Sequence, residues 1–269
     1  MLRARLTVGK VDVKKGEDGD LPLDDHRATW QARAGKSGIR MHNITWQRVG
    51  GYTKLPALIG QLGADPATVL ASAGLPREIL DSGEARMPYS GLGRLLQGAS
   101  TQTGHKHLAL LAGRMWELAD LGLVGQAAKN CKTVGESLRL LTAYQHLAGN
   151  GGEVFVNKRN SIVNLGYAIR DPSATNKDQI NDAALAGAFS FMRELCGNAF
   201  IPTAVYLPQV EPEDRIYYRR TFKACPHFEA QYCAMRFPAH WLQHPVASAD
   251  RGKRRRAERA LQSIGDNEL

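Results

Sequence analysis

The sequence predicts an α+β fold, with a helical N-terminal half followed by a small, mainly antiparallel four-stranded sheet with interspersed helices. Three observations lead to this fold class. Apolar residues recur with helical spacing from Thr53 to Ala148. After the glycine-rich run at residues 149–152, the apolar period changes to that of strands. Strand-like and helical segments then alternate towards the C-terminus.

The first half is predicted to form helices that begin and end at recognisable capping residues. Asp65 is a favourable N-cap, Pro66 suits the first helical position, and Gly74 ends that helix. Thr133 and Glu136 are spaced as a capping box at the start of the last helix of this half. The predicted helices are residues 55–63, 65–74, 90–104, 107–118 and 133–149.

The second half begins with two strands around a short polar turn within residues 153–171, where Val163, Leu165 and Tyr167 alternate with other residues. The next helix carries an apolar stripe, which consists of Ile180, Ala184, Ala188, Phe191 and Leu195. The later segments are a helix at 176–198, a strand at 203–210, a helix at 211–222 with Pro212 at its first position, a strand within 227–238 and a helix at 248–265.

Composition divides the chain into three parts. Residues 1–45 are polar, mixed in charge and without a helical stripe, so they are predicted to be a disordered extension, and Met41 is a possible true start. Residues 46–250 form the predicted folded domain, and residues 251–269 a basic terminal helix. The formal charge of +9 divides into +3 for residues 1–40, +3 for 41–250 and +3 for 251–269. The body is therefore nearly balanced, which does not indicate nucleic-acid binding by the body.

Several protein classes are excluded by what the sequence lacks. It has no apolar run of about 18 residues and no signal peptide, so no membrane association is expected. Its four cysteines have no CxxC spacing, which favours reduced thiols in a cytoplasmic protein. Nucleotide-binding, nucleophile-elbow and zinc-protease motifs are missing. We therefore expect no catalytic residues, no metal, no cofactor and no enzymatic activity.

The segment DRIYYRRTFKACPHF, residues 214–228, combines basic and aromatic residues in the way that nucleic-acid contacts often do. Within a predicted helix, Tyr217, Tyr218 and Phe222 instead suit apolar packing, and the arginines suit a solvated face. The packing role is the prediction adopted for this segment.

The order and spacing of several segments resemble a known family. These segments are LPALIGQLGADPATVLASAGLP, TGHKHLALLAGRM, LGLVGQAAKNCKTVGESLRLLTAYQHL and IPTAVYLPQVEPEDRIYYRRTFKACPHFEAQYCAMRFPAHWLQHPV. Over roughly residues 54–261 the chain resembles the N-terminal effector-sensing domain, of the type often labelled arabinose-binding, of AraC/XylS-type transcription regulators. No single motif is specific, but the series in this order is.

The resemblance implies a sensor domain that forms a homodimer and responds to a small-molecule effector, whose identity the sequence does not give. In that family a C-terminal domain with two helix-turn-helix units binds DNA. The chain ends at Leu269, where that domain would begin, so DNA contact is expected only through a domain absent here, with residues 251–269 as the connector. A stand-alone binding protein or a dominant-negative partner of a full-length regulator is the alternative, and an enzyme on the same fold is a third.

The effector is predicted to bind where the helical half meets the strand half, since two differently built layers rarely close on each other completely. Aromatic residues from both sides are candidates for its walls, because a tyrosine combines an apolar ring with an orienting hydroxyl. The candidates are Trp116 and Tyr144 from the helices and Tyr167 and Tyr206 from the strands. Plain core positions are the alternative for each of them.

Overall fold

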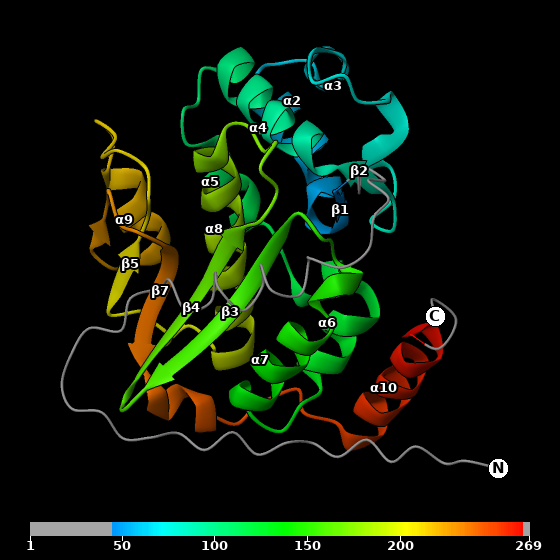
Figure 1. Ribbon diagram of the computed structural model, residues 1–269, viewed down its shortest axis with the longest axis vertical. Coiled ribbons are helices and arrows are strands. Elements are labelled where there is room, and N and C mark those ends of the chain that lie inside the picture. The colour runs from blue at the N-terminus through cyan, green and yellow to red at the C-terminus, as the bar shows by residue number, and fades with distance from the viewer. Residues whose placement is uncertain (1–44, 266–269) are drawn as a thin grey trace, which may run out of the picture. The chain divides into compact units, whose positions relative to one another are not determined.

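The computed structural model describes residues 45–265, with side chains described to residue 263, and it confirms the α+β fold (Figure 1). The predicted N-terminal extension and the possible start at Met41 lie outside these residues, apart from residue 45. The α-helices are α2 (Leu55–Gln61), α3 (Pro66–Ser72), α4 (Tyr89–Thr103), α5 (Leu108–Arg114), α6 (Gly122–Lys129), α7 (Val134–Ala143), α8 (Lys177–Cys196), α9 (Ile216–Phe222) and α10 (Arg251–Gly265). Short 3-10 helices are η1 (Gly50–Lys54), η2 (Arg77–Leu80), η3 (Leu118–Leu121), η4 (Gln145–Leu147) and η5 (Ala239–Gln243).

The main sheet has five strands in the order β3-β4-β7-β5-β6. All pairs are antiparallel except β5 with β6. Four of these strands are the predicted ones; β6 has only two residues, too few to show a period. A separate antiparallel pair, β1 with β2, was not predicted because each strand has three residues. The strands are β1 (Trp46–Arg48), β2 (Arg86–Pro88), β3 (Gly152–Arg159), β4 (Ile162–Ile169), β5 (Ala204–Tyr206), β6 (Pro226–His227) and β7 (Cys233–Pro238).

Local capping fits the predicted helix starts in the first half. The Asp65 carboxylate accepts hydrogen bonds from the backbone N–H groups of Ala67 and Thr68, at 3.2 and 3.1 Å. The Thr133 hydroxyl accepts from the N–H of Glu136, whose own carboxylate accepts from the N–H of Lys132 instead of that of Thr133. The N-cap hydrogen bond of the predicted capping box therefore forms, whereas its reciprocal bond is replaced by one to the preceding residue.

The predicted start of the helix containing YYRRTF is wrong. Helix α9 begins at Ile216, so Pro212 lies outside it. The acidic residues in front of α9 form a turn, in which the Glu211 carboxylate accepts from Arg215 at 2.8 Å. The Glu211–Arg215 hydrogen bond stabilises this turn, which forms in place of the first turn of the predicted helix.

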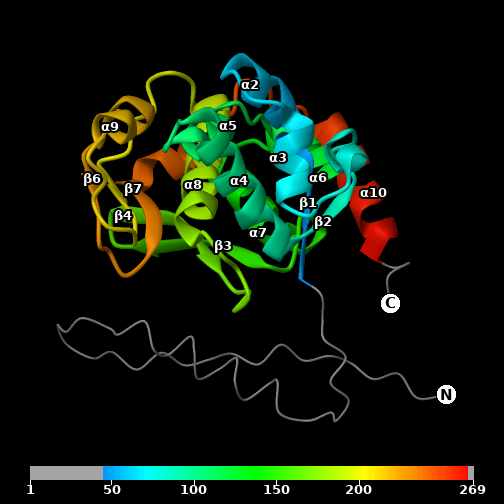
Figure 2. The same ribbon diagram turned by 90° about the horizontal axis from the view of Figure 1, so that it is seen from above.

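Helix α8 is the centre of the fold. Strands β4 and β7 lie on one side of it and α5 on the other, as Figures 1 and 2 show. The α5 and α8 backbones approach closely at Gly113, where a Cβ atom would lie 2.3 Å from the carbonyl oxygen of Ala183. Residues of α8 belong to both apolar cores, Ile180 and Ala183 to the N-terminal core and Phe189 to the core against the sheet.

Helix α9 docks on α8 through a buried polar network. The Tyr218 hydroxyl donates to Oδ2 of Asp182 at 2.7 Å, and the Gln209 side chain donates to Oδ1 at 2.7 Å. Tyr218 and Phe222 are buried and the arginines of α9 are exposed, which confirms the packing role predicted for YYRRTF. Burial raises the pKa of Asp182 to about 7, although both hydrogen bonds favour the charged form.

The raised pKa of Asp182 predicts a pH-dependent stability. Folded protein holds a proton on this carboxyl between its ordinary pKa of 3.8 and about 7, where unfolded protein does not. The free energy of unfolding therefore receives a contribution that is present below pH 3.8 and is lost as the pH rises to about 7. Asp182→Asn should remove this decline, which amounts to a few kcal/mol at roughly 1.4 kcal/mol per pKa unit.

Urea unfolding of parent and Asp182→Asn at pH 5 and pH 8 measures this effect, with the exposed Asp81→Asn as the matched control. Asparagine is tolerable because the amide of Gln209 can turn to accept from it. An unchanged pH profile in Asp182→Asn would contradict the assignment.

Candidate functional site

A partly open cavity of about 400 Å³ lies between the helical half and the sheet. Helices α7 and α8 and strands β3 and β4 contribute a large part of its wall. Trp116 and residues of β1, β2, η1, η3, η4, α4, α6 and α10 contribute to the remainder. This volume lies within the ~300–1,000 Å³ range of small-molecule sites. Its position is the predicted junction of the two halves.

The wall of the cavity is mainly apolar. On α8, Ala184 and Ala188 are only half-buried, because no other side chain covers them from the cavity side. Both belong to the apolar stripe that the sequence predicted for this helix. The other apolar wall residues from helices and strands include Leu138, Leu141, Val154, Leu165, Ile180, Phe191, Met192 and Leu261.

Trp116 is held in the wall by two glycines. A Cβ atom at Gly51 would lie 2.3 Å from Cδ1 of the indole, and one at Gly187 would lie 2.1 Å from Cε3, so only glycine leaves room for the ring at both positions. The indole also contacts Tyr52 edge-on, with ring centroids 4.9 Å apart, and stacks with Phe191 at 6.3 Å. Its Nε1–H is buried and finds no hydrogen-bond partner within the described part of the chain.

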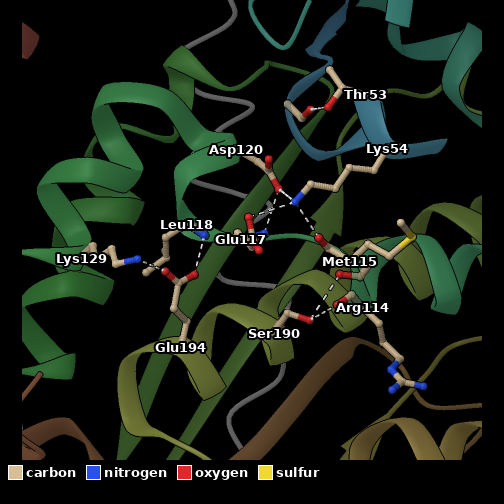
Figure 3. A network of polar contacts seen from close by, with 12 residues as sticks. Thr53, Lys54, Arg114, Met115, Glu117, Leu118, Asp120, Lys129, Ser190 and Glu194 are labelled. Atoms are coloured by element: carbon tan, nitrogen blue, oxygen red, sulfur yellow. Dashed lines mark hydrogen bonds and ion pairs between the residues drawn. The ribbon is translucent and has the colours of Figure 1, made fainter. Parts of the chain in front are cut away.

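Polar contacts position the segment that carries Trp116, as Figure 3 shows. The Lys54 ammonium donates to the Met115 carbonyl at 2.8 Å and pairs with the Asp120 carboxylate at 2.9 Å. The Glu194 carboxylate accepts from the Leu118 N–H at 2.7 Å and pairs with Lys129 at 2.7 Å. These contacts attach residues 115–120 to η1, α6 and α8, so the indole has little freedom to leave the wall.

Tyrosine hydroxyls supply polar groups at the cavity. Tyr52 and Tyr167 line it, and the Tyr167 hydroxyl lies 2.9 Å from that of Tyr89. Burial raises the pKa of Tyr167 to about 12 and raises the pKa of Tyr52 and Tyr89 further. All three hydroxyls are therefore neutral at physiological pH and can form hydrogen bonds without contributing charge.

The charged residues of the cavity wall are paired or exposed. Arg48 forms an ion pair with Glu84, and its Nη1 donates to the Asp120 carbonyl at 2.6 Å. The Glu84 side chain is 78% exposed, which places this pair at the mouth. Arg86, also exposed, packs its guanidinium over the Trp46 ring at 4.0 Å.

The structure brings together three of the four candidate site residues. Trp116, Tyr144 and Tyr167 line the cavity, and whether they bind a ligand stays a prediction. Tyr206 lies on the opposite face of the sheet: it pairs with Ala234, which pairs with Gly166, whereas Leu165 and Tyr167 point to the cavity. On that face the Tyr206 ring stacks on His227 at 5.1 Å and lies under Arg236.

Sequence reasoning missed Tyr52, Phe191 and the two alanines of α8 as wall residues. Phe191, Ala184 and Ala188 carried a usable signal, since all three lie on one stripe of a long helix. Tyr52 precedes the first predicted helix, and no periodicity marks it. Across residues 45–265, no helix is long and apolar enough to cross a membrane. No group of three His, Cys, Asp or Glu side chains in that range is arranged to hold a metal ion.

Comparison with known proteins agrees with the resemblance noted in the sequence. The family model described as the arabinose-binding domain of AraC transcription regulators, N-terminal, matches residues 63–246. The HTH-type transcriptional regulator VirS of Mycobacterium tuberculosis is 24% identical over 215 residues, which are 79% of this chain and 62% of VirS. The ornithine utilization regulator of Pseudomonas aeruginosa is 20% identical over 193 residues, 72% of this chain and 57% of that regulator.

A solved structure shares the fold. The crystal structure of the transcriptional regulator CdpR from Pseudomonas aeruginosa superposes with a TM-score of 0.53 at 17% identity, over 74% of this chain and 61% of CdpR. This chain therefore spans about three-fifths of the length of the regulators that it matches.

The packing around Trp116 predicts the effect of Gly187→Ala. The added methyl group must displace the indole, so the free energy of unfolding should fall by about 1–3 kcal/mol, as overpacking does. Tryptophan emission should change as the ring leaves its site. Gly60→Ala is the matched control, because nothing lies within 4 Å of a Cβ at this exposed helical position, and it should be neutral or stabilising. Urea unfolding followed by fluorescence measures both, and equal effects in the two variants would refute the packing argument.

Proposed function

Because the chain belongs to the family of arabinose-binding domains of AraC transcription regulators, we propose that it is the effector-sensing portion of such a regulator. We further propose that its effector occupies the cavity lined by Trp116, Tyr144 and Tyr167. The volume and the mainly apolar wall with a few hydroxyl groups support this role. The domain would act by binding and not by catalysis.

One observation carries this proposal: Leu261, from the last helix, forms part of the cavity wall. Helix α10 packs on α6, and its apolar contact residues Ala257 and Leu261 are buried. A compound in the cavity would therefore lie next to the helix that leads to the C-terminus. Such a contact is what a sensor needs if it is to report on the occupancy of its own cavity.

Helix α10 is also attached to the cavity wall by charge. Arg254 pairs with Glu136 of α7 at 2.6 Å and with Glu258 of its own helix at 2.9 Å. At the start of α10 the Asp250 carboxylate accepts from the N–H groups of Gly252 and Lys253, at 2.8 and 2.9 Å. Any effector that shifts α7 would thus act on α10 through two routes, the Leu261 contact and the Arg254–Glu136 pair.

Residues 251–269 are the proposed connector from the sensing domain, which occupies 46–250, to a helix-turn-helix domain. One relative is named an HTH-type regulator, and this chain matches 62% of it, which supports such an arrangement. An effector with different affinities for two positions of α10 would shift their populations. The change in DNA binding would follow from that shift.

We also propose a cytoplasmic homodimer. The apolar residues of α7 give no support for the dimer, because Val134, Leu138 and Leu140 are buried within the domain. The family membership is its basis, and a twofold arrangement is the usual one. Sedimentation at tens of micromolar should show a dimer, and monomer alone at these concentrations would count against it.

The sensing role predicts that tyrosine hydroxyls affect the response to an effector. A thermal-shift screen of metabolites should yield a compound that raises the Tm of the full chain. Tyr144→Phe and Tyr167→Phe each remove one hydroxyl at the cavity, and at least one of them should reduce this shift, since a ligand hydrogen bond is worth about 0.5–1.5 kcal/mol. Tyr206→Phe is the matched control on the far face of the sheet and should respond like the parent.

Hydrogen exchange on the same compound tests the coupling. Amide exchange across residues 251–265 should change when the compound is bound, because α10 forms part of the wall. If Tyr144→Phe and Tyr167→Phe both respond like the parent and α10 exchange stays constant, the effector site lies elsewhere.

A further inference from the structure

We infer that the effector is a neutral, mainly hydrocarbon compound, an alkyl or aromatic molecule whose buried part carries no charge. The inference rests on the proposed function and narrows it to one chemical class. Three features support it: the apolar wall of the cavity, the charges at its mouth, and the tyrosine end, where the hydroxyl groups of Tyr52, Tyr89 and Tyr167 lie.

The inner wall offers a ligand apolar contacts almost throughout. Ala184 and Ala188 form its α8 side and Leu141 its α7 side, with Leu165 of β4 opposite. A ligand gains free energy here in proportion to the apolar surface that it removes from water. Hydrocarbon therefore fits the greater part of the volume better than any polar group does.

A charged ligand would find few partners inside. The charged residues of the wall are Arg48, Glu84 and Arg86, of which Arg48 already pairs with Glu84 and with the Asp120 carbonyl. Glu84 and Arg86 are exposed at the mouth, so they do not compensate charge at depth. A buried charge without a partner is costly. Ornithine, after which one relative is named, carries charges at both ends and does not suit this wall.

A polyhydroxylated ligand would also leave hydrogen bonds unmade. The Thr142 hydroxyl donates to the Leu138 carbonyl at 3.0 Å, and Oε1 of Gln145 accepts from the Val154 N–H at 2.6 Å. These two wall groups are therefore partly committed to the protein. Each sugar hydroxyl buried without a partner would cost free energy. Arabinose, which the family description names, is thus a poor match for this cavity.

The tyrosine end suits a single neutral polar group. Only one of the Tyr89 and Tyr167 hydroxyls can donate across the 2.9 Å contact between them, so one hydroxyl hydrogen of the pair remains for another acceptor. Tyr52, also on the wall, adds a second neutral hydroxyl. A hydroxyl or carbonyl group at one end of the ligand would satisfy these groups without introducing charge.

The test is calorimetric titration of the full chain with 1-hexanol, 1-heptanol and 1-octanol, and separately with ornithine and arabinose. Affinity for the alcohols should rise about fourfold with each added methylene, from the free energy of burying one such group. Ornithine and arabinose should not bind. Ala188→Phe should weaken alcohol binding about tenfold or more, because the ring fills the space that the alkyl chain needs.

A second variant protects the test against misfolding of the first. Leu141→Ala enlarges the cavity, so the rise in affinity with chain length should continue to longer alcohols than in the parent. Alcohols that bind parent and Ala188→Phe equally, or that do not bind the parent, would overturn the inference. Ornithine or arabinose binding that Ala188→Phe abolishes would overturn the hydrocarbon class but leave the cavity as the sensing site. The tyrosine and hydrogen-exchange tests decide the sensing role independently of all these results.

Discussion

Helix α8 packs against α5 on one side and against the main sheet on another, and its third side faces α7 and β3. The packing of the rest of the domain depends on how the side chains of α8 fit these three neighbours. Towards α5 it presents small residues, so that Gly113 can meet the backbone at Ala183. Towards the sheet it presents bulky side chains such as Phe189 and Met192, which fill the space above β4 and β7. On its third side Ala184 and Ala188 are too small to reach α7 and β3. The cavity is the volume that these two methyl groups leave unfilled.

An apolar cavity of this size lowers the stability of the fold, because the atoms that line it lack contacts on one side. The surrounding elements keep it open through contacts that do not depend on its contents. Lys54 and Glu194 hold residues 115–120, the two glycines fix the Trp116 indole, and the Tyr89–Tyr167 contact ties α4 to β4. A ligand would supply the missing contacts, so its binding would also recover the packing free energy that the empty cavity lacks.

Much of the fold follows from local features of the sequence, and the site follows only in part. The strand period around Leu165 and the capping at Asp65 and Thr133 depend on neighbouring residues alone, and both are present in the structure. The start of α9 was misplaced because Pro212 and its acidic neighbours suit a turn as well as a helix. Tyr206, a candidate for the cavity wall, lies on the other face of the sheet, because its orientation follows from pairing with Ala234, a residue 28 positions away. Periodicity shows which side of α8 faces inward, but it does not show whether another side chain stands opposite, and this is why the stripe alone did not single out Ala184 and Ala188 as cavity residues.

The placement of these two alanines has an evolutionary consequence. The close packing of α8 on α5 uses other faces of the helix. Replacements at 184 and 188 therefore change the volume of the cavity and leave the packing of α5 on α8 unchanged. If the effector occupies this cavity, as proposed, ligand preference can diverge between related regulators by one or two codon changes in a single helix. A lineage could adopt a new signal molecule in this way without first acquiring a new scaffold.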